Sequence, residues 1–255
     1  SIPLRFAIRW LSYPLVFGGC ASFMIWALYA GIPYWPTTPI VAAAGLLLIA
    51  GLERIQPFRR AWLEDHQDTL TDLLHMLVNL SVIQFTAEFL AKLGDAVPAS
   101  VRLFHMIHHS AERLYWMNGE RRHPLHAALM AGPGLVVLLI SGAPSAVVAT
   151  WFGILTVHLA FQHSNLDYSV GWLRHVLGVA EVHRWHHKRD FEDAQVNFGE
   201  FSTVWDRLFG TFYDSAGKLG KAEVGLHEKD YPRNYFGQFI DPLRPTSAYP
   251  AGHNS

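Results

Sequence analysis

The stretch YPLVFGGCASFMIWALYAGI, residues 13–32, indicates the fold class of this chain. It has no charged side chain over 20 residues, and an α-helix needs about 20 apolar residues to cross a bilayer. A second apolar run, PIVAAAGLLLIAGLERI at 39–55, is uncharged until Glu53. Because the turn-forming sequence PYWPTTP joins the two runs, we expect a membrane-spanning helical hairpin within residues 1–60.

Basic residues on the outer sides of this hairpin predict its orientation. Arg5 and Arg9 precede the first run, and Arg54, Arg59 and Arg60 follow the second. Basic residues are enriched on the cytoplasmic side of membrane helices, so both ends of the hairpin and both termini are expected in the cytoplasm. A cleaved signal peptide fits poorly, since a second apolar run follows the first and no small-residue cleavage pattern separates them.

The composition fits a membrane-embedded part joined to a polar part. The 255 residues are 51% hydrophobic, 13% aromatic and 16% charged, which is more apolar than a typical soluble domain. The formal charge of −1 gives no reason to expect a nucleic-acid partner. The single cysteine, Cys20, cannot form an internal disulfide and is interpreted as a small packing or lipid-facing residue.

Two further apolar blocks lie at 71–94 and 129–165, and the sequence SGAPS predicts a bend within the second. From residue 189 onward the chain is polar. We therefore predict an all-α, integral-membrane, multi-pass helical bundle with a cytoplasmic histidine-rich cap. It would form a single domain over residues 1–255, with the histidine motifs in the region 70–243.

Histidines are concentrated in two short stretches, FHMIHHS and VHRWHHK, which repeat the same spacing. Helical positions i, i+3 and i+4 share one face, so each stretch gathers three imidazoles. A solvated or hydrogen-bonded histidine face is the alternative, but protonated imidazoles this close repel one another, whereas neutral imidazoles around a metal do not. The candidate ligands are His105, His108, His109, His183, His186 and His187.

The donor set narrows the choice of metal. No cysteine accompanies the histidines, which argues against a structural thiolate zinc site. Nitrogen donors without sulfur suit iron, copper, nickel or zinc, and six imidazoles exceed the needs of one tetrahedral ion. Two metal ions are therefore the economical interpretation. Two iron ions beside a membrane suggest oxygen chemistry on a lipid, and zinc could occupy the iron sites in a purified sample. A haem with two histidine ligands would leave the repeated triplets unexplained.

Five motifs occur in order along the chain: FHMIHHS, RRHPLHA, FQHSNLD, VHRWHHK and VNFGEFSTVWDRLFGTF. Together with the later GLHEKDYPRNYFGQFIDPLR they resemble the fatty acid hydroxylase superfamily, the integral-membrane sterol desaturase and hydroxylase proteins. The resemblance implies a non-haem di-iron centre that uses dioxygen and an electron-donor protein to hydroxylate or desaturate a lipid, such as a sterol, fatty acyl chain or long-chain alcohol. It also implies that the two triplets are ligand groups and that His163 is a ligand between them.

Other histidines are weaker candidates. His158 is a second-tier metal ligand, since it lies five residues before His163 and on another helical face. His123 is either a metal ligand or a polar residue behind the ligands, and His126 stands where the superfamily often carries glutamate. The remaining histidines are expected at the surface or in packing: His66, His75, His175, His227 and His253.

Three residues of the later motifs have expected supporting roles. Asn197 or Asp206 would hold a ligating imidazole by its second nitrogen, or would belong to a packing and turn element. Arg184 is expected to be a structural ion-pair partner.

The chain departs from the superfamily before the first triplet. Members carry an earlier YWxHRxxH segment there, whereas the stretch AEFLAKLGDAVPASVRLF lacks both histidines and offers only Lys92 and Asp95. The explanations are a real deletion, a stretch absent from this chain, which the lack of an initiating methionine slightly favours, or a site completed by His66 or His75. The alternative function is therefore a metal-binding or structural membrane protein of the same fold without catalytic activity.

Overall fold

The computed structural model describes residues 2–90, 106–190, 193–215, 219, 223–227 and 231–243. Within these residues the regular structure is helical, and only isolated β-bridges occur. The long helices are α1 Ile2–Ser12, continued without a break by η1 Tyr13–Phe17 and α2 Gly18–Tyr29, then α3 Tyr34–Ile55, α4 Thr69–Leu90, α6 Pro124–Ile140 and α7 Ser145–His163. This confirms the predicted all-α class.

Among the described residues, three helical segments are long and apolar enough to cross a membrane, namely Pro3–Tyr29, Tyr34–Ile55 and Ser145–His163. The first two contain most of the predicted hairpin. The predicted bend at SGAPS is also confirmed, since α6 ends at Ile140 and α7 begins at Ser145. Gly142 has a φ of 70° in this turn, a value that glycine adopts without steric cost.

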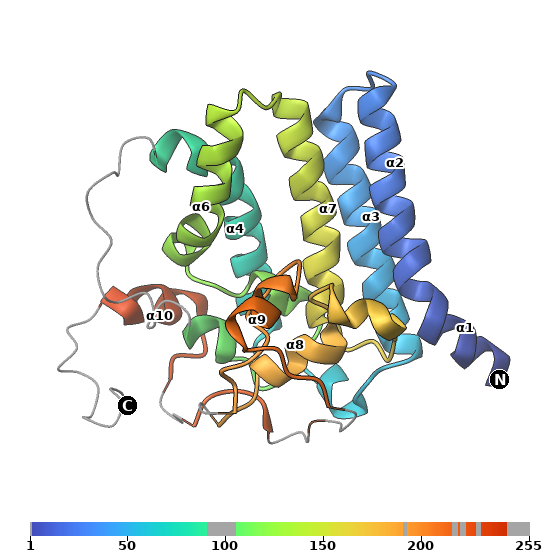
Figure 1. Cartoon of the computed structure of the whole chain (residues 1–255). Helices are drawn as coiled ribbons and strands as arrows, with labels where there is room; N and C mark the ends of the chain where they lie inside the picture. The colour runs from blue at the N-terminus through green and yellow to red at the C-terminus, as the bar shows by residue number, and fades with distance from the viewer. Residues whose placement is uncertain are drawn as a thin grey trace.

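Helix α7 packs against both α2 and α3, while α4 packs against α6 (Figure 1). Two glycines make the close approach of α7 to the hairpin possible. A Cβ at Gly153 of α7 would overlap Thr38 of α3 and come within 3.0 Å of the Met24 Sδ of α2. A Cβ at Gly45 of α3 would lie 3.0 Å from Val157 of α7. Small residues serve the same purpose in other membrane helix bundles.

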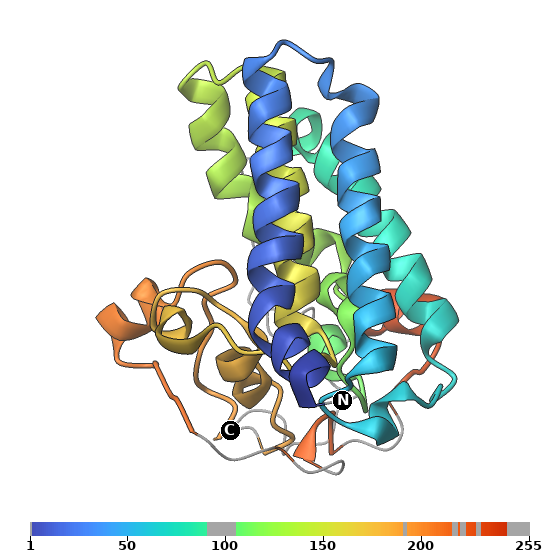
Figure 2. The ribbon, with the colours of Figure 1, turned by 90° about the vertical axis from the view of Figure 1, so that its right-hand side faces the viewer.

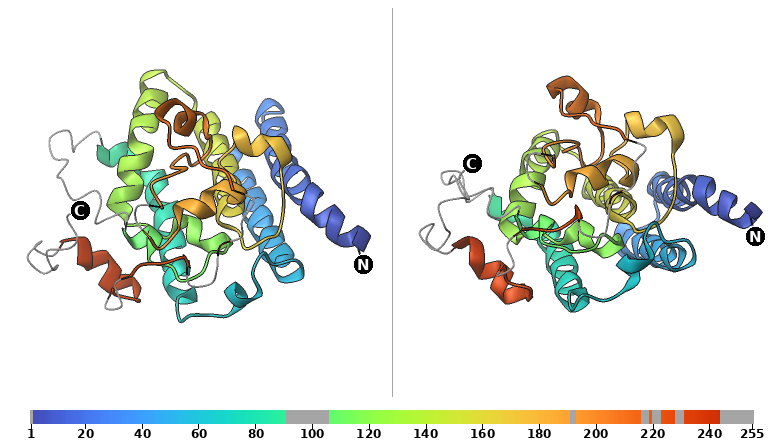
Figure 3. Two further views of the ribbon diagram at one scale, coloured as in Figure 1. Left: turned by 60° about the horizontal axis from the view of Figure 1, so that its bottom comes forward. Right: turned by 90° about the horizontal axis from the view of Figure 1, so that it is seen from below.

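The polar elements gather at one end of the bundle (Figures 1 and 2). Helix α3 ends and α4 begins at this end, α6 starts here and α7 finishes here. The same end of the bundle also contains the short elements, which are η2 Arg60–Leu63, η3 Trp116–Glu120, η4 Gly171–His175, α8 Ala180–His186, α9 Val204–Phe209, α10 Tyr235–Ile240 and η6 Asp241–Leu243. From below, α8 lies under the bundle and α9 and α10 lie at its periphery (Figure 3).

A buried carboxylate ties the helix ends together at this polar end. Glu53 of α3 accepts hydrogen bonds from the backbone amides of Trp116 in η3, at 2.8 Å, and Asn165 after α7, at 2.7 Å. The Arg184 guanidinium of α8 donates to the Ser164 carbonyl at 2.7 Å. Arg184 therefore has a structural role, but among the described residues its hydrogen bonds go to the carbonyls of Ser164 and Leu166 and not to the predicted ion-pair partner. These contacts fix the end of α7, where His163 is located.

Candidate metal centre

Four buried histidines from three separate segments converge at the end of α7. Each offers one ligand atom, and these atoms lie within 4.8 Å of one another. His108 comes from the helical turn 106–109, His163 is the last residue of α7, His183 belongs to α8, and His187 follows α8 directly. Residues from both predicted triplets therefore meet around His163.

The Nε2 atom of His163 is central to this group. It lies 3.1 Å from the Nε2 atoms of His108 and His183 and 3.2 Å from that of His187. The Nε2 atoms of His183 and His187 are themselves 3.1 Å apart. Four ring nitrogens thus point at one shared position.

The opposite ring nitrogens decide which form these imidazoles take. The Nδ1 of His108 faces the Arg121 carbonyl at 3.2 Å, and the Nδ1 of His163 faces the Leu159 carbonyl at 3.1 Å. A carbonyl only accepts hydrogen bonds, so in both rings the hydrogen is assigned to Nδ1 and the Nε2 carries a lone pair. Two lone pairs 3.1 Å apart cannot bond to each other. A cation between them satisfies both, so these residues fit a metal ion.

Burial keeps the imidazoles neutral. The pKa values of His183 and His187 are lowered well below the ordinary value, first by burial and then by the neighbouring imidazoles. Burial also lowers the pKa of His186. A metal binds the neutral imidazole, so this environment holds the rings in the binding form at neutral pH.

A second pair of histidines lies beside the group of four. The Nε2 atoms of His109 and His186 are 3.1 Å apart, and the ring centroids of His109 and His187 are 4.8 Å apart. The Nδ1 of His186 faces the carbonyls of Ala194 and Val196 at 3.0 and 3.1 Å. Its lone pair is therefore directed at His109, in the same manner as in the group of four. His105, the remaining predicted ligand, lies outside the described residues.

His158 and His123 are not part of either group. His158 bonds with the Tyr13 hydroxyl at 2.8 Å and the Gly178 carbonyl at 3.1 Å. His123 faces the Phe239 carbonyl at 3.1 Å and accepts from the Leu125 amide at 3.1 Å. Both ring nitrogens of each residue are thereby engaged, which leaves no lone pair for a metal in this arrangement.

The motif VNFGEFSTVWDRLFGTF forms a packing and turn element, which was one of its two predicted roles. Asn197 donates to the carbonyls of Val182 and Tyr213 at 2.9 and 2.8 Å. The Asp206 carboxylate accepts from the amides of Phe198 and Gly199 at 2.7 and 2.9 Å. Both side chains thus stabilise the loop against α8. The Nδ1 atoms of His108, His163 and His186 face backbone carbonyls instead.

A polar face of α4, which the histidine motifs do not indicate, supports His108. The Asp72 carboxylate, which is fully buried, accepts from Tyr115, Asn118 and Arg121, each at 2.8 Å. Arg121 carries the carbonyl that faces His108. The signal in the sequence is the spacing of Asp72, His75 and Asn79, which puts three polar side chains on one face of an apolar helix.

His75 and Asn79 hold the same segment one turn further along α4. The two ring nitrogens of His75 bond with the Arg122 carbonyl at 3.1 Å and the Gln238 side chain at 3.0 Å. Asn79 donates to the carbonyls of Glu120 and Arg122 at 2.7 and 2.8 Å. His75 is therefore a packing residue, as one of its two predicted roles stated, and it is not a member of the group of four.

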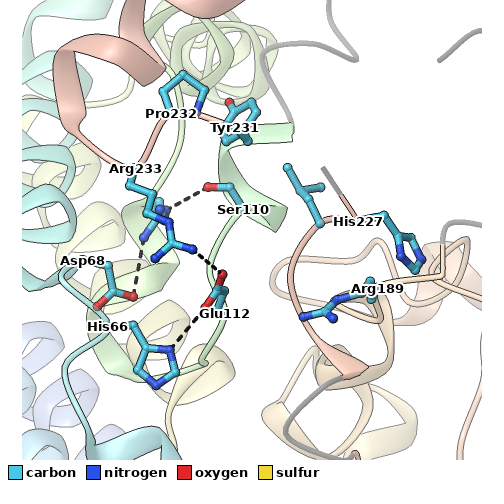
Figure 4. A pocket seen from close by; sticks show the side chains of 11 residues that line it. His66, Asp68, Ser110, Glu112, Arg189, His227, Tyr231, Pro232 and Arg233 are labelled. Carbon is cyan, nitrogen blue, oxygen red and sulfur yellow. Dashed lines mark hydrogen bonds and ion pairs between the residues drawn. The ribbon is translucent and has the colours of Figure 1, made fainter. Parts of the chain in front are cut away.

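A pocket of about 430 Å³ lies next to the first histidine turn, with Ser110 on its wall (Figure 4). His66 also lines it and faces Glu112 at 3.5 Å, and it is not a member of the group of four. Glu112 pairs in turn with Arg233 at 3.2 Å. Charged and polar side chains dominate this lining, so the pocket suits a polar group and not an acyl chain.

The comparisons with known proteins agree with the predicted resemblance. Residues 95–211 match the family model described as fatty acid hydroxylase. The ornithine lipid hydroxylase OlsE of Rhizobium tropici is 24% identical over 250 residues, covering 80% of this chain and 75% of that protein. Alkylglycerol monooxygenase of Danio rerio is 27% identical over 118 residues, covering 45% of this chain and 25% of that protein. No solved structure matches. The resemblance to the fatty acid hydroxylase superfamily is confirmed.

Proposed function

We propose that this chain, with its fatty acid hydroxylase region at residues 95–211, is a membrane-bound lipid hydroxylase that uses two iron ions, dioxygen and external electrons. The observation that carries the proposal is the group of four buried histidines, whose Nε2 atoms converge at the end of a helix long enough to span a membrane. Hydroxylation is favoured over desaturation because the relatives are named as a hydroxylase and a monooxygenase.

Two ligand groups are proposed for the two ions. His108, His163, His183 and His187 would hold the first, and the pair His109 and His186, together with His105, would hold the second. Iron, when bound, supplies the activation of dioxygen needed to insert an oxygen atom into a C–H bond. Backbone carbonyls hold His108 and His163 in their neutral tautomers. The surrounding protein keeps water away from the site, since all four residues of the first group are buried.

The proposed substrate is a membrane lipid, with ornithine lipid as the first candidate because of the relative from Rhizobium tropici. The membrane spans support a substrate taken from the bilayer. We further propose that the histidine end and both termini face the cytoplasm, where a soluble electron-donor protein can reach them. The basic residues that flank the hairpin support this orientation.

The test measures metal content and oxygen incorporation on the same preparation. Protein in lipid nanodiscs is loaded with iron and supplied with a reduced donor, ¹⁸O₂ and a panel of ornithine, sterol, acyl and long-chain alcohol lipids. Two irons per chain and a product that carries ¹⁸O from dioxygen are expected. The quadruple change of His108, His109, His186 and His187 to alanine should abolish both, whereas His227→Ala, an exposed histidine, serves as the matched control.

A second candidate is a metal-binding membrane protein without turnover. It is favoured by the sequence before the first triplet, which lacks the superfamily's earlier histidines, and by the pair His109 and His186, which offers only two nitrogens among the described residues. One metal ion per chain, or two irons without labelled product from any lipid of the panel, would support this candidate and overturn the first.

A further inference from the structure

Two short helices at the histidine end expose large apolar side chains. Helix α9 exposes Val204, Trp205, Leu208 and Phe209, and Trp205 and Phe209 are 62% and 73% exposed. Helix α10 exposes Phe236 and Ile240, with Phe236 at 70%. Large apolar side chains rarely gather on a face that is in contact with water, so each of these two faces is expected to contact another molecule or a membrane.

Polar contacts fix the outward direction of the α9 face. Asp206, on the inner side of α9, accepts from the amides of Phe198 and Gly199. Arg207 donates to the His175 carbonyl at 2.8 Å and lies over the Phe212 ring, 4.0 Å from its centroid. The buried Asp206 thus bonds the inner side of α9 to the rest of the protein, and the exposed Arg207 attaches its flank. The apolar side chains point away from these contacts.

Helix α10 is built in the same way. Its inward residue Gln238 is fully buried, bonds with His75 at 3.0 Å and donates to the Pro232 carbonyl at 2.8 Å. Asn234 caps the helix by accepting from the Gly237 amide at 2.8 Å. Phe236 and Ile240, four residues apart, share the outward face. Each short helix therefore has one bonded polar side and one exposed apolar side.

The positions of the two helices point to the identity of the occupant. Helices α9 and α10 lie on different sides of the bundle at about the same height (Figures 1 and 3). A partner protein or second copy covers one side of a molecule, whereas a bilayer surrounds a bundle of spanning helices at a single level. The loop before α9 also packs against a candidate span: the ring centroids of Phe201 in this loop and Trp151 in α7 are 5.2 Å apart.

We infer that the apolar faces of α9 and α10 lie in the headgroup layer of the bilayer and set the depth at which the protein sits. Short amphipathic helices with tryptophan and phenylalanine on one face bind at this boundary. The inference rests on the membrane location in the proposed function, and it is independent of the bound metal and of turnover.

The experiment places one fluorescent label at a time on single-cysteine variants in lipid vesicles. Cys20 is replaced by serine, and a bimane label is attached at Leu208→Cys in α9, at Ile240→Cys in α10, or at the control Asp190→Cys. Asp190 is a polar position whose side chain is 63% exposed. Quenching by lipids with a nitroxide near the headgroup is compared with quenching by aqueous iodide.

The labels at 208 and 240 should be quenched by the nitroxide lipids and protected from iodide, and the label at 190 should show the reverse. Iodide quenching at 208 or 240 equal to that at 190 would mean that the face is in water and would overturn the inference. Protection from both quenchers would mean that protein covers the face, which also overturns it. Because neither iron nor substrate is required, failure here is distinguishable from failure of the proposed hydroxylase activity.

Discussion

Replacing His163 with alanine removes the imidazole that touches all three others of the first group, at 3.1 to 3.2 Å. Removing even a residue that only hydrogen-bonds to a metal ligand weakens metal affinity about 10- to 100-fold. For loss of His163 itself we therefore take a decrease in affinity of about 100-fold. With metal at about 1,000 times the wild-type dissociation constant, binding stabilises the wild type by about 4 kcal/mol. The variant would gain about 1.4 kcal/mol under the same conditions.

The assay compares melting temperatures in detergent with and without added metal. The difference of about 2.7 kcal/mol corresponds to a metal-dependent increase that is roughly 5 to 10 °C smaller in the variant. His158→Ala is the matched control, because His158 is buried on the same helix and its ring nitrogens bond with Tyr13 and Gly178, outside the group of four. It should lower both melting temperatures and leave their difference unchanged. A His163→Ala protein with the full wild-type increase would refute the ligand assignment.

Three further predictions follow from the contacts around the site. Lowering the pH below about 6.5 should reduce the unfolding free energy of the metal-free protein. Burial depresses the folded-state pKa of His183 and His187, so the unfolded chain binds more protons than the folded chain in this range. An unfolding free energy that stays constant in denaturant titrations from about pH 7 to 5 would contradict this. Asp72→Ala should cost about 3–5 kcal/mol, because the buried Arg121 loses its carboxylate partner at 2.8 Å and is left with the more distant Asp68 at 3.9 Å. It should also lower the metal content measured by mass spectrometry. Gly199→Ala should cost about 1–3 kcal/mol, since its Cβ would overlap the Ser202 carbonyl, whereas Gly134→Ala on α6, with open space around it, should change stability by less than about 1 kcal/mol.

The apolar runs were the part of the fold that the sequence predicted best. Helices such as Tyr34–Ile55 follow from a single local property, the length of a stretch without charge. The block at 71–94 was harder to interpret. In the structure it forms α4 at Thr69–Leu90. Its polar face, led by Asp72, turns toward the site, and such packing depends on distant segments.

The histidine spacing predicted which side chains converge better than it predicted how they are grouped. Positions i and i+4 of the second triplet, His183 and His187, do share the group of four, as one helical face requires. His186 instead meets His109 of the other triplet. Helix α8 ends at His186, and the carbonyls of Ala194 and Val196 orient its ring. Backbone carbonyls have no residue identity, so no spacing rule could have located these partners.

The depth of the metal site follows from combining the two proposals. Helix α7 ends at His163, and its lower end lies near the level of α9 and α10 (Figure 2). If those helices lie in the headgroup layer, the four histidines lie at the depth of the polar ends of the lipids. A lipid in its normal orientation then presents its headgroup and first carbons to the site, while carbons in the middle of the acyl chain lie deeper in the bilayer. The polar pocket beside Ser110 fits the same picture, because it accommodates a polar group and not a chain. Taken together, the two proposals lead us to expect hydroxylation at the headgroup end of the lipid.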